Sequence, residues 1–421
     1  MNLPEDFIRE TRSVMGEERF NRFLGAFDEE APTSIRLNPR LRGTVPCVRS
    51  AADYTGTVPS VQQVPWCPEG YYLEGRPQFT FDPLFHAGCY YVQEASSMFI
   101  THVLRALANS SFFTLHSSLH VLDMCAAPGG KSTAMRTVLP EGSTLVSNEP
   151  MANRAQILLE NITKWGYDNC IVTNNYPRDF RKAKAKFDII LCDVPCSGEG
   201  MFRKDPNAIS EWSPQNVEKC WRLQREIVAD AWECLNPGGI LIYSTCTYNT
   251  KENEENVRWI LENCDAEMLS IPTEPEWHIT GSLLEGFDAP VYRFIPGITR
   301  GEGLFMAVLQ HRGTVPRVSK ERQRLNYTGT VPSVLRQLTP DLPEGDHPRI
   351  DLPYQDALRY LRGEALVLPA DTPRGIVTVT YKGFPLGPAK NIGNRANNLY
   401  PKPWRIKTTH LPSEPVEILP L

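Results

Sequence analysis

Hydrophobic positions divide the chain into three regions with different patterns. Apolar residues recur at helical spacing over residues 4–15 and 17–27, and residues 34–38 then alternate like a strand. From 119 to 310, short apolar runs alternate with longer amphipathic segments. The region after residue 345 has short β-prone runs separated by glycine and proline. We therefore expect a small α+β unit, an α/β region and a β-rich C-terminal unit.

The apolar runs of the middle region predict a doubly wound parallel sheet. Residues 120–124 and 187–191 are almost continuously apolar, as is typical of parallel strands with both faces covered. A final strand is expected over residues 303–309. Before this region a helix is expected from 93 to 107, whereas residues 66–91 are rich in Gly, Pro and aromatic residues and are expected to be irregular.

These patterns also predict domain boundaries. We expect an N-terminal α+β domain over residues 1–92, an α/β domain over 93–312, a Pro-rich linker over 313–345 and a β-rich domain over 346–421.

Two short sequences are repeated far apart in the chain. Residues 42–46 recur at 312–316, and residues 54–61 recur at 327–334. Each copy contains glycine and proline, which favour turns over packed elements. We interpret the copies as loop insertions without a chemical role.

The net charge and its distribution along the chain do not decide whether the protein binds nucleic acid. The 421-residue chain has a net charge of −5, which taken alone argues against a nucleic-acid-binding protein. Two stretches, residues 31–52 and 380–407, contain basic residues and no acidic ones. Local basic patches on an acidic body are sufficient to follow a phosphate backbone.

Cysteine usage indicates a reducing compartment. The chain has 11 cysteines, an odd number without the spacing of a disulfide framework. No apolar run approaches the roughly 18 residues that a membrane helix needs, and residues 1–10 do not resemble a signal peptide. No Cys or His spacing is typical of a metal site. We expect a cytoplasmic monomer that binds neither a membrane nor a metal.

Two thiols and one carboxylate follow strands of the predicted sheet. Asp193 and Cys196 come at the end of the strand that begins at 187, and Cys246 follows the apolar run at 239–243. Open α/β sheets bind their ligands beyond the carboxyl ends of the strands. The three side chains therefore indicate a site for covalent chemistry.

A glycine-containing turn follows the first strand of the middle region. Gly129 and Gly130, in the turn 125–131, allow backbone amides to approach a ligand at a helix N-terminus. Glu149, at the end of the next strand, is placed to accept hydrogen bonds from ribose hydroxyls. The chain has neither a triphosphate-binding nor a nicotinamide-type glycine pattern, so the nearby cysteines favour S-adenosylmethionine as cofactor. We interpret Arg154 as an ordinary surface charge.

Four sequence blocks in this order resemble the Sun-type RNA cytosine-C5 methyltransferases: residues 123–131, 193–198, 203–206, and 243–249 with 252–254. Within that family the chain is most similar to bacterial 16S ribosomal RNA methyltransferases of the RsmF kind. Residues 387–405 resemble the PUA-like RNA-binding tail of that subgroup. The resemblance implies a Rossmann-like S-adenosylmethionine-dependent methyltransferase sheet, an N-terminal domain of RNA-binding type and a PUA-like C-terminal domain.

The resemblance also implies roles for single residues. Cys246 would add to carbon 6 of cytosine, Cys196 would help to release the product, and Asp193 would hold the edge of the base. The residues expected to bind the cofactor are Cys125, Ala126, Ala127, Pro128, Gly129, Gly130, Lys131, Glu149, Tyr176 and Asp193. The residues expected to bind RNA are Lys204, Lys390, Arg395, Lys402 and Arg405.

One position departs from the family pattern. The family usually has an aspartate near the adenine where this chain has Tyr176. Stacking of Tyr176 on the adenine and substitution of the missing acid by Asp179 are both compatible with the sequence. Phe202, Trp212 and Tyr248 are candidates either for lining the cytosine pocket or for an ordinary core.

The function that the resemblance implies is methyl transfer from S-adenosylmethionine to carbon 5 of a cytosine in RNA, most directly 16S ribosomal RNA. Transfer RNA stays open as substrate, because the motifs report the reaction and not the RNA. A DNA cytosine methyltransferase would exchange the roles of Cys196 and Cys246. A non-catalytic RNA-binding ribosome assembly factor is the alternative from a different class, and the intact cysteine pair with Asp193 argues against it.

Overall fold

A computed structural model describes most of the chain. It covers residues 3–41, 62–109, 118–313, 332–343, 345–416 and 418–419. The repeats at 42–46 and 54–61 lie outside the described residues, as do most of the residues in their copies. Within the described ranges, no helix has the length and apolar character needed to cross a membrane. The same ranges contain no cluster of His, Cys, Asp and Glu suited to holding a metal ion.

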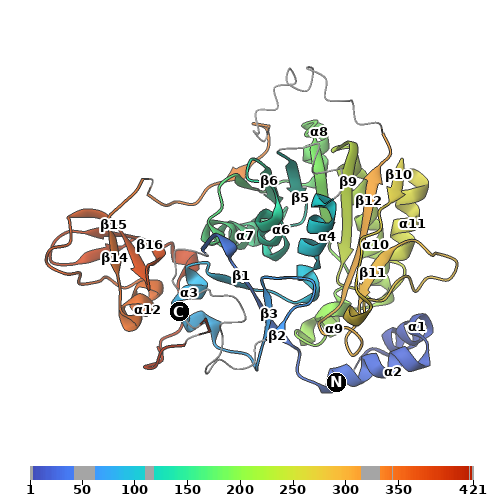
Figure 1. The fold of residues 1–421 in the computed structure, drawn as a ribbon, viewed down its shortest axis with the longest axis horizontal. Coiled ribbons are helices and arrows are strands. Elements are labelled where there is room, and N and C mark those ends of the chain that lie inside the picture. Colours follow the sequence, from blue (N-terminus) through green and yellow to red (C-terminus); the bar gives the residue numbers. More distant parts are fainter. Residues whose placement is uncertain are drawn as a thin grey trace.

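A large sheet forms the centre of the molecule (Figure 1). Its path runs β10-β12-β9-β8-β5-β6-β7-β13, and β11 pairs with β12. The parallel strands are β5 (His120–Asp123), β6 (Thr144–Asn148), β7 (Cys170–Thr173), β8 (Phe187–Asp193) and β9 (Leu235–Thr245). The antiparallel strands are β10 (Ala266–Met268), β11 (Val291–Phe294), β12 (Leu304–His311) and β13 (Gln337–Leu338).

The Rossmann-like sheet is confirmed, but its two edges differ from the predicted parallel pattern. The expected last strand, β12, runs antiparallel to β9. The segment predicted to be a linker contributes β13, which pairs antiparallel with β7. Antiparallel direction cannot be inferred from an apolar run, because the same run fits either pairing when both faces are buried.

Helices cover both faces of the sheet because its side chains alternate between two apolar cores. Val121 and Ile189 point into one core, and their neighbours Leu122 and Ile190 point into the other. The first core is covered by α4 (Phe99–Ala108) and α6 (Gly130–Val138), next to which α7 (Ala152–Trp165) packs. The second is covered by α8 (Pro177–Lys182), α10 (Pro214–Trp232) and α11 (Glu254–Asn263). A short helix, α9 (Pro206–Glu211), precedes α10.

The N-terminal region combines two helices with a small antiparallel sheet. The helices are α1 (Glu5–Met15) and α2 (Glu17–Gly25). The sheet has the order β2-β3-β1-β4, formed by β1 (Thr33–Leu37), β2 (Gln62–Gln63), β3 (Gly70–Leu73) and β4 (Tyr90–Val92). The prediction that residues 66–91 are irregular is therefore wrong, since they hold β3, the short helix α3 (Pro83–His86) and the start of β4.

The helix predicted from residue 93 begins later than expected. The described chain makes a 3₁₀ turn at Ser96–Met98 and enters α4 only at Phe99. The carboxylate of Glu94 accepts hydrogen bonds from the backbone amides of Ser96 and Ser97 and from that of Glu302. These bonds hold the segment in a turn, because a side-chain acceptor competes with the helical hydrogen-bond pattern.

The C-terminal region is a second small sheet, and it packs against the N-terminal one (Figure 1). Its order is β14-β15-β16-β17, formed by β14 (Arg349–Asp351), β15 (Gly375–Tyr381), β16 (Phe384–Asn391) and β17 (Ala396–Asn398), with helix α12 (Tyr354–Arg362) beside it. One apolar cluster joins Ile35 and Tyr90 of the N-terminal sheet to Leu358 and Tyr400 of this region. The two small sheets therefore share a core.

Candidate active site

The two predicted thiols meet at the carboxyl edge of the large sheet. β8 and β9 are neighbouring parallel strands, so the loops that follow them leave the sheet side by side. The first loop carries Cys196 and the second carries Cys246. Their Sγ atoms lie 3.2 Å apart, and both side chains are partly exposed. A substrate at this edge can thus reach both sulfurs.

The contact between the two sulfurs affects the pKa of Cys196. The hydrogen-bond contact with Cys246, followed by burial, raises the pKa of Cys196 well above its ordinary value. Cys196 is therefore a neutral thiol at physiological pH. In this state it can donate its proton to the neighbouring sulfur of Cys246.

Asp193 lies at the end of β8, between the thiols and the glycine turn. Its Oδ1 accepts a hydrogen bond from Ser244 Oγ at 2.9 Å, and its Oδ2 accepts one from Lys131 Nζ at 2.9 Å. Burial lowers the pKa of Lys131, but the charge and hydrogen bond of Asp193, together with Cys246 and Asp123, raise it, so the net shift is upward. Lys131 is therefore a charged link from the glycine turn to the carboxylate beside the thiols.

The glycine turn after β5 has a defined backbone conformation. Gly129 has φ +111°, in the left-handed region that favours glycine, and it precedes the first residue of α6. The carbonyl of Pro128 accepts hydrogen bonds from Tyr91 Oη and Asn161 Nδ2. Cys125, Ala126 and Ala127 are buried. These contacts fix the turn that was predicted to approach the cofactor.

Glu149 has the geometry of a ligand-binding carboxylate. Its side chain is 1% exposed, and its Oε1 accepts a hydrogen bond from the backbone amide of Met151 at 2.9 Å. Its buried Oε2 has no hydrogen-bond partner within the described residues. Apart from the ion pair with Arg154 at 3.4 Å, this buried oxygen has no hydrogen-bond donor among these residues, and a ribose hydroxyl would supply one. The residues present here therefore fit an adenosine-containing cofactor.

The interpretation of Arg154 as an ordinary surface charge is wrong. Its Nη2 donates to the carbonyl of Ala127 at 2.9 Å, and its Nη1 lies 3.4 Å from Glu149 Oε2. The guanidinium thus joins the glycine turn to the acid at the end of β6. Sequence alone could not reveal this, because the two partners are distant from each other along the chain.

Tyr176 and Asp179 have different environments at the start of α8. The carboxylate of Asp179 accepts a hydrogen bond from the backbone amide of Tyr176 at 2.9 Å, at the start of α8. The Tyr176 ring is 53% exposed, with the guanidinium of Arg178 5.0 Å from its centroid. Asp179 therefore caps the helix, whereas the Tyr176 ring is exposed and has Arg178 over one of its faces.

Phe202, Trp212 and Tyr248 belong to the core. All three are buried in one aromatic cluster with Phe7 and Phe23 of the two N-terminal helices. They attach these helices to the loops that carry the thiols. These buried side chains therefore do not line a pocket for the cytosine.

The residues predicted to bind RNA are not gathered at the thiols. Lys204 is exposed on the turn after the Cys196 loop. Lys390, Arg395 and Lys402 are exposed in the C-terminal region, and Arg405 donates to the carbonyl of Tyr400. RNA contacts from these four residues would lie on a different domain from the thiols.

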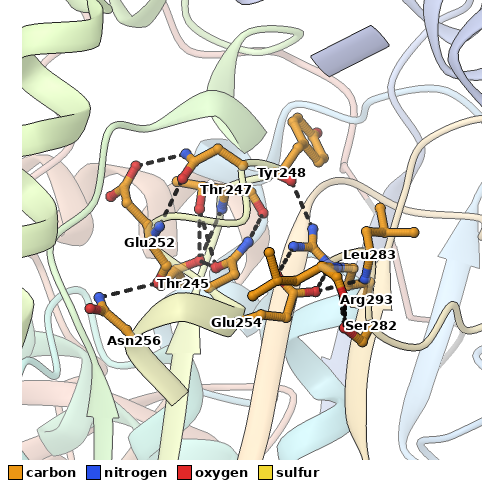
Figure 2. A network of polar contacts seen from close by, with 12 residues as sticks. Thr245, Thr247, Tyr248, Glu252, Glu254, Asn256, Ser282, Leu283 and Arg293 are labelled. Atoms are coloured by element: carbon orange, nitrogen blue, oxygen red, sulfur yellow. Dashed lines mark hydrogen bonds and ion pairs between the residues drawn. The ribbon is translucent and has the colours of Figure 1, made fainter. Parts of the chain in front are cut away.

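A buried polar network behind Cys246 was not predicted from the sequence (Figure 2). Glu252 accepts three hydrogen bonds, and Glu254 forms a fully buried ion pair with Arg293, which also donates to the carbonyl of Tyr248 at 2.8 Å. The one sequence feature that pointed to it is the acidic block at 252–254. Acidic residues are almost never fully buried unless they are paired.

Three known protein families match three separate parts of the chain. The N-terminal domain of 16S rRNA methyltransferase RsmF matches residues 3–95, and 16S rRNA methyltransferase RsmB/F matches residues 111–310. The methyltransferase RsmF PUA domain matches residues 347–406.

Individual proteins show the same similarity. Ribosomal RNA small subunit methyltransferase F of Serratia proteamaculans is 33% identical over 77% of this chain and 66% of its own length. The protein of the same name from Escherichia fergusonii is 32% identical over 78% of this chain and 68% of its own length. A solved methyltransferase homolog from Pyrococcus horikoshii is 26% identical to this chain, with a TM-score of 0.57. The match covers 73% of this chain and 99% of the homolog's chain. The chain spans about two thirds of the length of the curated relatives it matches.

Proposed function

The chain belongs to the ribosomal RNA small subunit methyltransferase F family, and we propose that it methylates carbon 5 of a cytosine in 16S ribosomal RNA. The observation that carries the proposal is the 3.2 Å separation of the Cys196 and Cys246 sulfurs beside Asp193. This combination suits a reaction in which one thiol bonds to the base and a second group must help to break that bond.

Carbon 5 of cytosine is a poor nucleophile, so the reaction needs covalent assistance. Addition of the Cys246 thiolate to carbon 6 makes carbon 5 electron-rich enough to accept a methyl group. Asp193 would hold the base edge and stabilise the charge that develops on the ring. After methylation a water molecule acting as base takes the proton from carbon 5, its electron pair restores the double bond to carbon 6, and the carbon 6–sulfur bond breaks so that Cys246 leaves as a thiolate. Cys196 lies next to the departing sulfur and is assigned to this release step.

The cofactor site is proposed at the edge formed by β5 and β6. S-adenosylmethionine would supply the methyl group. Glu149 Oε2 would accept from the ribose, and Tyr176 would stack on the adenine. The turn at residues 125–131 would place backbone groups against the rest of the cofactor, next to Asp193.

The substrate is proposed to contact two regions. The target cytosine has to leave its stack to reach both thiols, as bases do in other enzymes that modify them. The exposed basic residues Lys390, Arg395 and Lys402 would hold the phosphate backbone farther away. The thiols, Asp193 and the glycine turn come from one chain, so the proposed site is complete in a monomer. We place the reaction in the cytoplasm, where ribosomal subunits of bacteria are assembled.

Bisulfite sequencing of total RNA from cells with and without the protein tests this function. The expected result is a cytosine in 16S ribosomal RNA that resists conversion only when the protein is present. Resistance that appears in transfer RNA alone would replace the proposed substrate. If RNA from the two cell types is identical, and the purified protein methylates neither RNA nor DNA, the proposal is wrong.

A further inference from the structure

The loops that carry the two thiols are joined by more than the neighbouring strands below them. We define the Cys196 loop as residues 194–201 and the Cys246 loop as residues 246–253. Each loop contains a glutamate whose carboxylate accepts hydrogen bonds from backbone amides of the other loop. The exchange is reciprocal, and both glutamates are buried.

Glu199 of the Cys196 loop holds the Cys246 loop. Its Oε2 accepts from the backbone amides of Tyr248 at 2.6 Å and Asn249 at 3.1 Å. Its Oε1 accepts from Trp212 Nε1 at 3.0 Å and from Asn249 Nδ2 at 2.9 Å. Four N–H donors therefore face one carboxylate that is 1% exposed. Such charge-assisted bonds are short and strongly directional.

Glu252 of the Cys246 loop holds the Cys196 loop in return. Its Oε2 accepts from the backbone amide of Ser197 at 3.0 Å, the residue next to Cys196, and from Gln224 Nε2 at 2.7 Å. Its Oε1 accepts from Asn249 Nδ2 at 2.9 Å. The Asn249 side chain thus donates to both glutamates and connects the two halves of the arrangement.

The Cys246 loop keeps other support that does not involve the Cys196 loop. The carbonyl of Tyr248 accepts a hydrogen bond from Arg293, whose charge is paired with Glu254, and Asn253 bonds to Thr245 and Thr247 (Figure 2). Disturbing the two glutamates should therefore shift one loop relative to the other without unfolding either. The quantity most directly affected is the position of Cys196 relative to Cys246.

We propose that Glu199 and Glu252 form a reciprocal clasp that fixes the relative positions of the two thiols and thereby couples adduct formation on Cys246 to its release by Cys196. They are positioning residues, since neither is needed to contact the substrate. This inference rests on the proposed function. If the clasp is loosened, Cys196 is no longer held in position beside Cys246. Release of the RNA from Cys246 should then be slower, because the rate of a step depends on the geometry of the groups that react.

Glu199→Gln and Glu252→Gln test the clasp with the smallest change of shape. In each variant an amide NH₂ faces N–H donors, so at least one buried donor loses its acceptor. Glu218→Gln is the matched control. Glu218 lies on α10 close to the same loop, but its carboxylate pairs with the side chains of Lys251 and Arg222 and not with either loop's backbone.

The measurement is steady-state methylation of 16S ribosomal RNA, with the covalent protein–RNA adduct counted on denaturing gels. Both clasp variants should lower kcat by about 100-fold while the KM for RNA and cofactor binding stay within about twofold. The adduct should accumulate at least about tenfold over wild type and over Glu218→Gln. A fold defect alone would lower activity without trapping the adduct.

The outcomes separate the clasp from the proposed function. A wild-type protein that does not methylate RNA contradicts the proposed function itself. An active wild type with clasp variants that turn over normally, or that lose kcat without trapping adduct, contradicts the clasp. If both glutamate variants fail to fold, Asn249→Ala provides the test, since it removes the donor shared by the two carboxylates. It should trap adduct to a smaller extent, and absence of trapping would overturn the proposal.

Discussion

The sulfurs of Cys196 and Cys246 lie 3.2 Å apart although the two residues are 50 positions apart in the chain. Adjacent parallel strands bring them together, because β8 ends just before Cys196 and β9 ends just before Cys246. Burial and the contact with Cys246 keep Cys196 protonated, which suits a group that assists departure of its neighbour.

Cys246→Ala is expected to abolish methylation while cofactor binding persists. The substitution removes the proposed nucleophile, and residual activity should fall below detection. The cofactor residues lie around β5 and β6, so the Kd for S-adenosylmethionine from calorimetry should stay within about twofold. Methyl transfer by the variant at a rate near that of wild type would assign the nucleophile to another residue.

Glu149→Gln is expected to weaken cofactor binding. The buried Oε2 of Glu149 is ion-paired with Arg154 at 3.4 Å but accepts no hydrogen bond among the described residues, so a ribose hydroxyl would bond there to a charged acceptor. Loss of such a bond costs about 1.5–3 kcal/mol, which is roughly a 10- to 100-fold rise in Kd. Glu141→Gln, at an exposed site, is the control. Equal Kd values for the two variants, measured by calorimetry, would place the ribose elsewhere.

Asp123 should make the apoprotein less stable as pH rises. Burial raises the pKa of this carboxyl from 3.8 to about 7 in the folded state. Its stabilising contribution is therefore complete below about pH 4 and is lost as pH rises through about 7. Asp123→Asn stays neutral at every pH and keeps the acceptor for Ser132.

Urea unfolding at pH 5 and pH 8 measures this effect. Wild type should lose more unfolding free energy than Asp123→Asn between the two pH values, by on the order of 2–3 kcal/mol. Comparison of the two proteins cancels the contributions of Glu252 and Glu302, whose pKa values are also raised to about 7 by burial. The same pH dependence in both proteins would show that Asp123 does not titrate in this range.

The sequence was sufficient to predict the central sheet and the approximate location of the site. Strands at 120–124 and 187–191 are almost continuously apolar, and the residues that follow them, at 125–131 and at 193–196, form the carboxyl edge. The direction of the strands at the sheet edges was not predictable, because the antiparallel strand β12 has the same apolar pattern as the parallel strands of the sheet. The strands β3 and β4 were missed because they are short and lie in a stretch rich in glycine and proline.

Contacts between distant residues explain the rest of what was missed. Arg154 has the sequence environment of a surface residue, yet it bonds to the carbonyl of Ala127. The partners of Glu199 and Glu252 include backbone amides of the other loop, and a sequence cannot show which residue a backbone amide bonds to. Burial of acidic residues at 199 and 252 becomes interpretable only after the two loops are placed side by side.

Mapping the covalent adduct of Cys196→Ala tests the central claim most directly. The variant keeps the proposed nucleophile and lacks the group assigned to release. Incubated with 16S ribosomal RNA and S-adenosylmethionine, it should form a complex that survives denaturation, and mass spectrometry should find the nucleotide on the peptide containing Cys246. Absence of a denaturation-resistant complex in an otherwise folded, cofactor-binding variant, or a nucleotide attached to any other residue, would contradict the assignment of the two thiols.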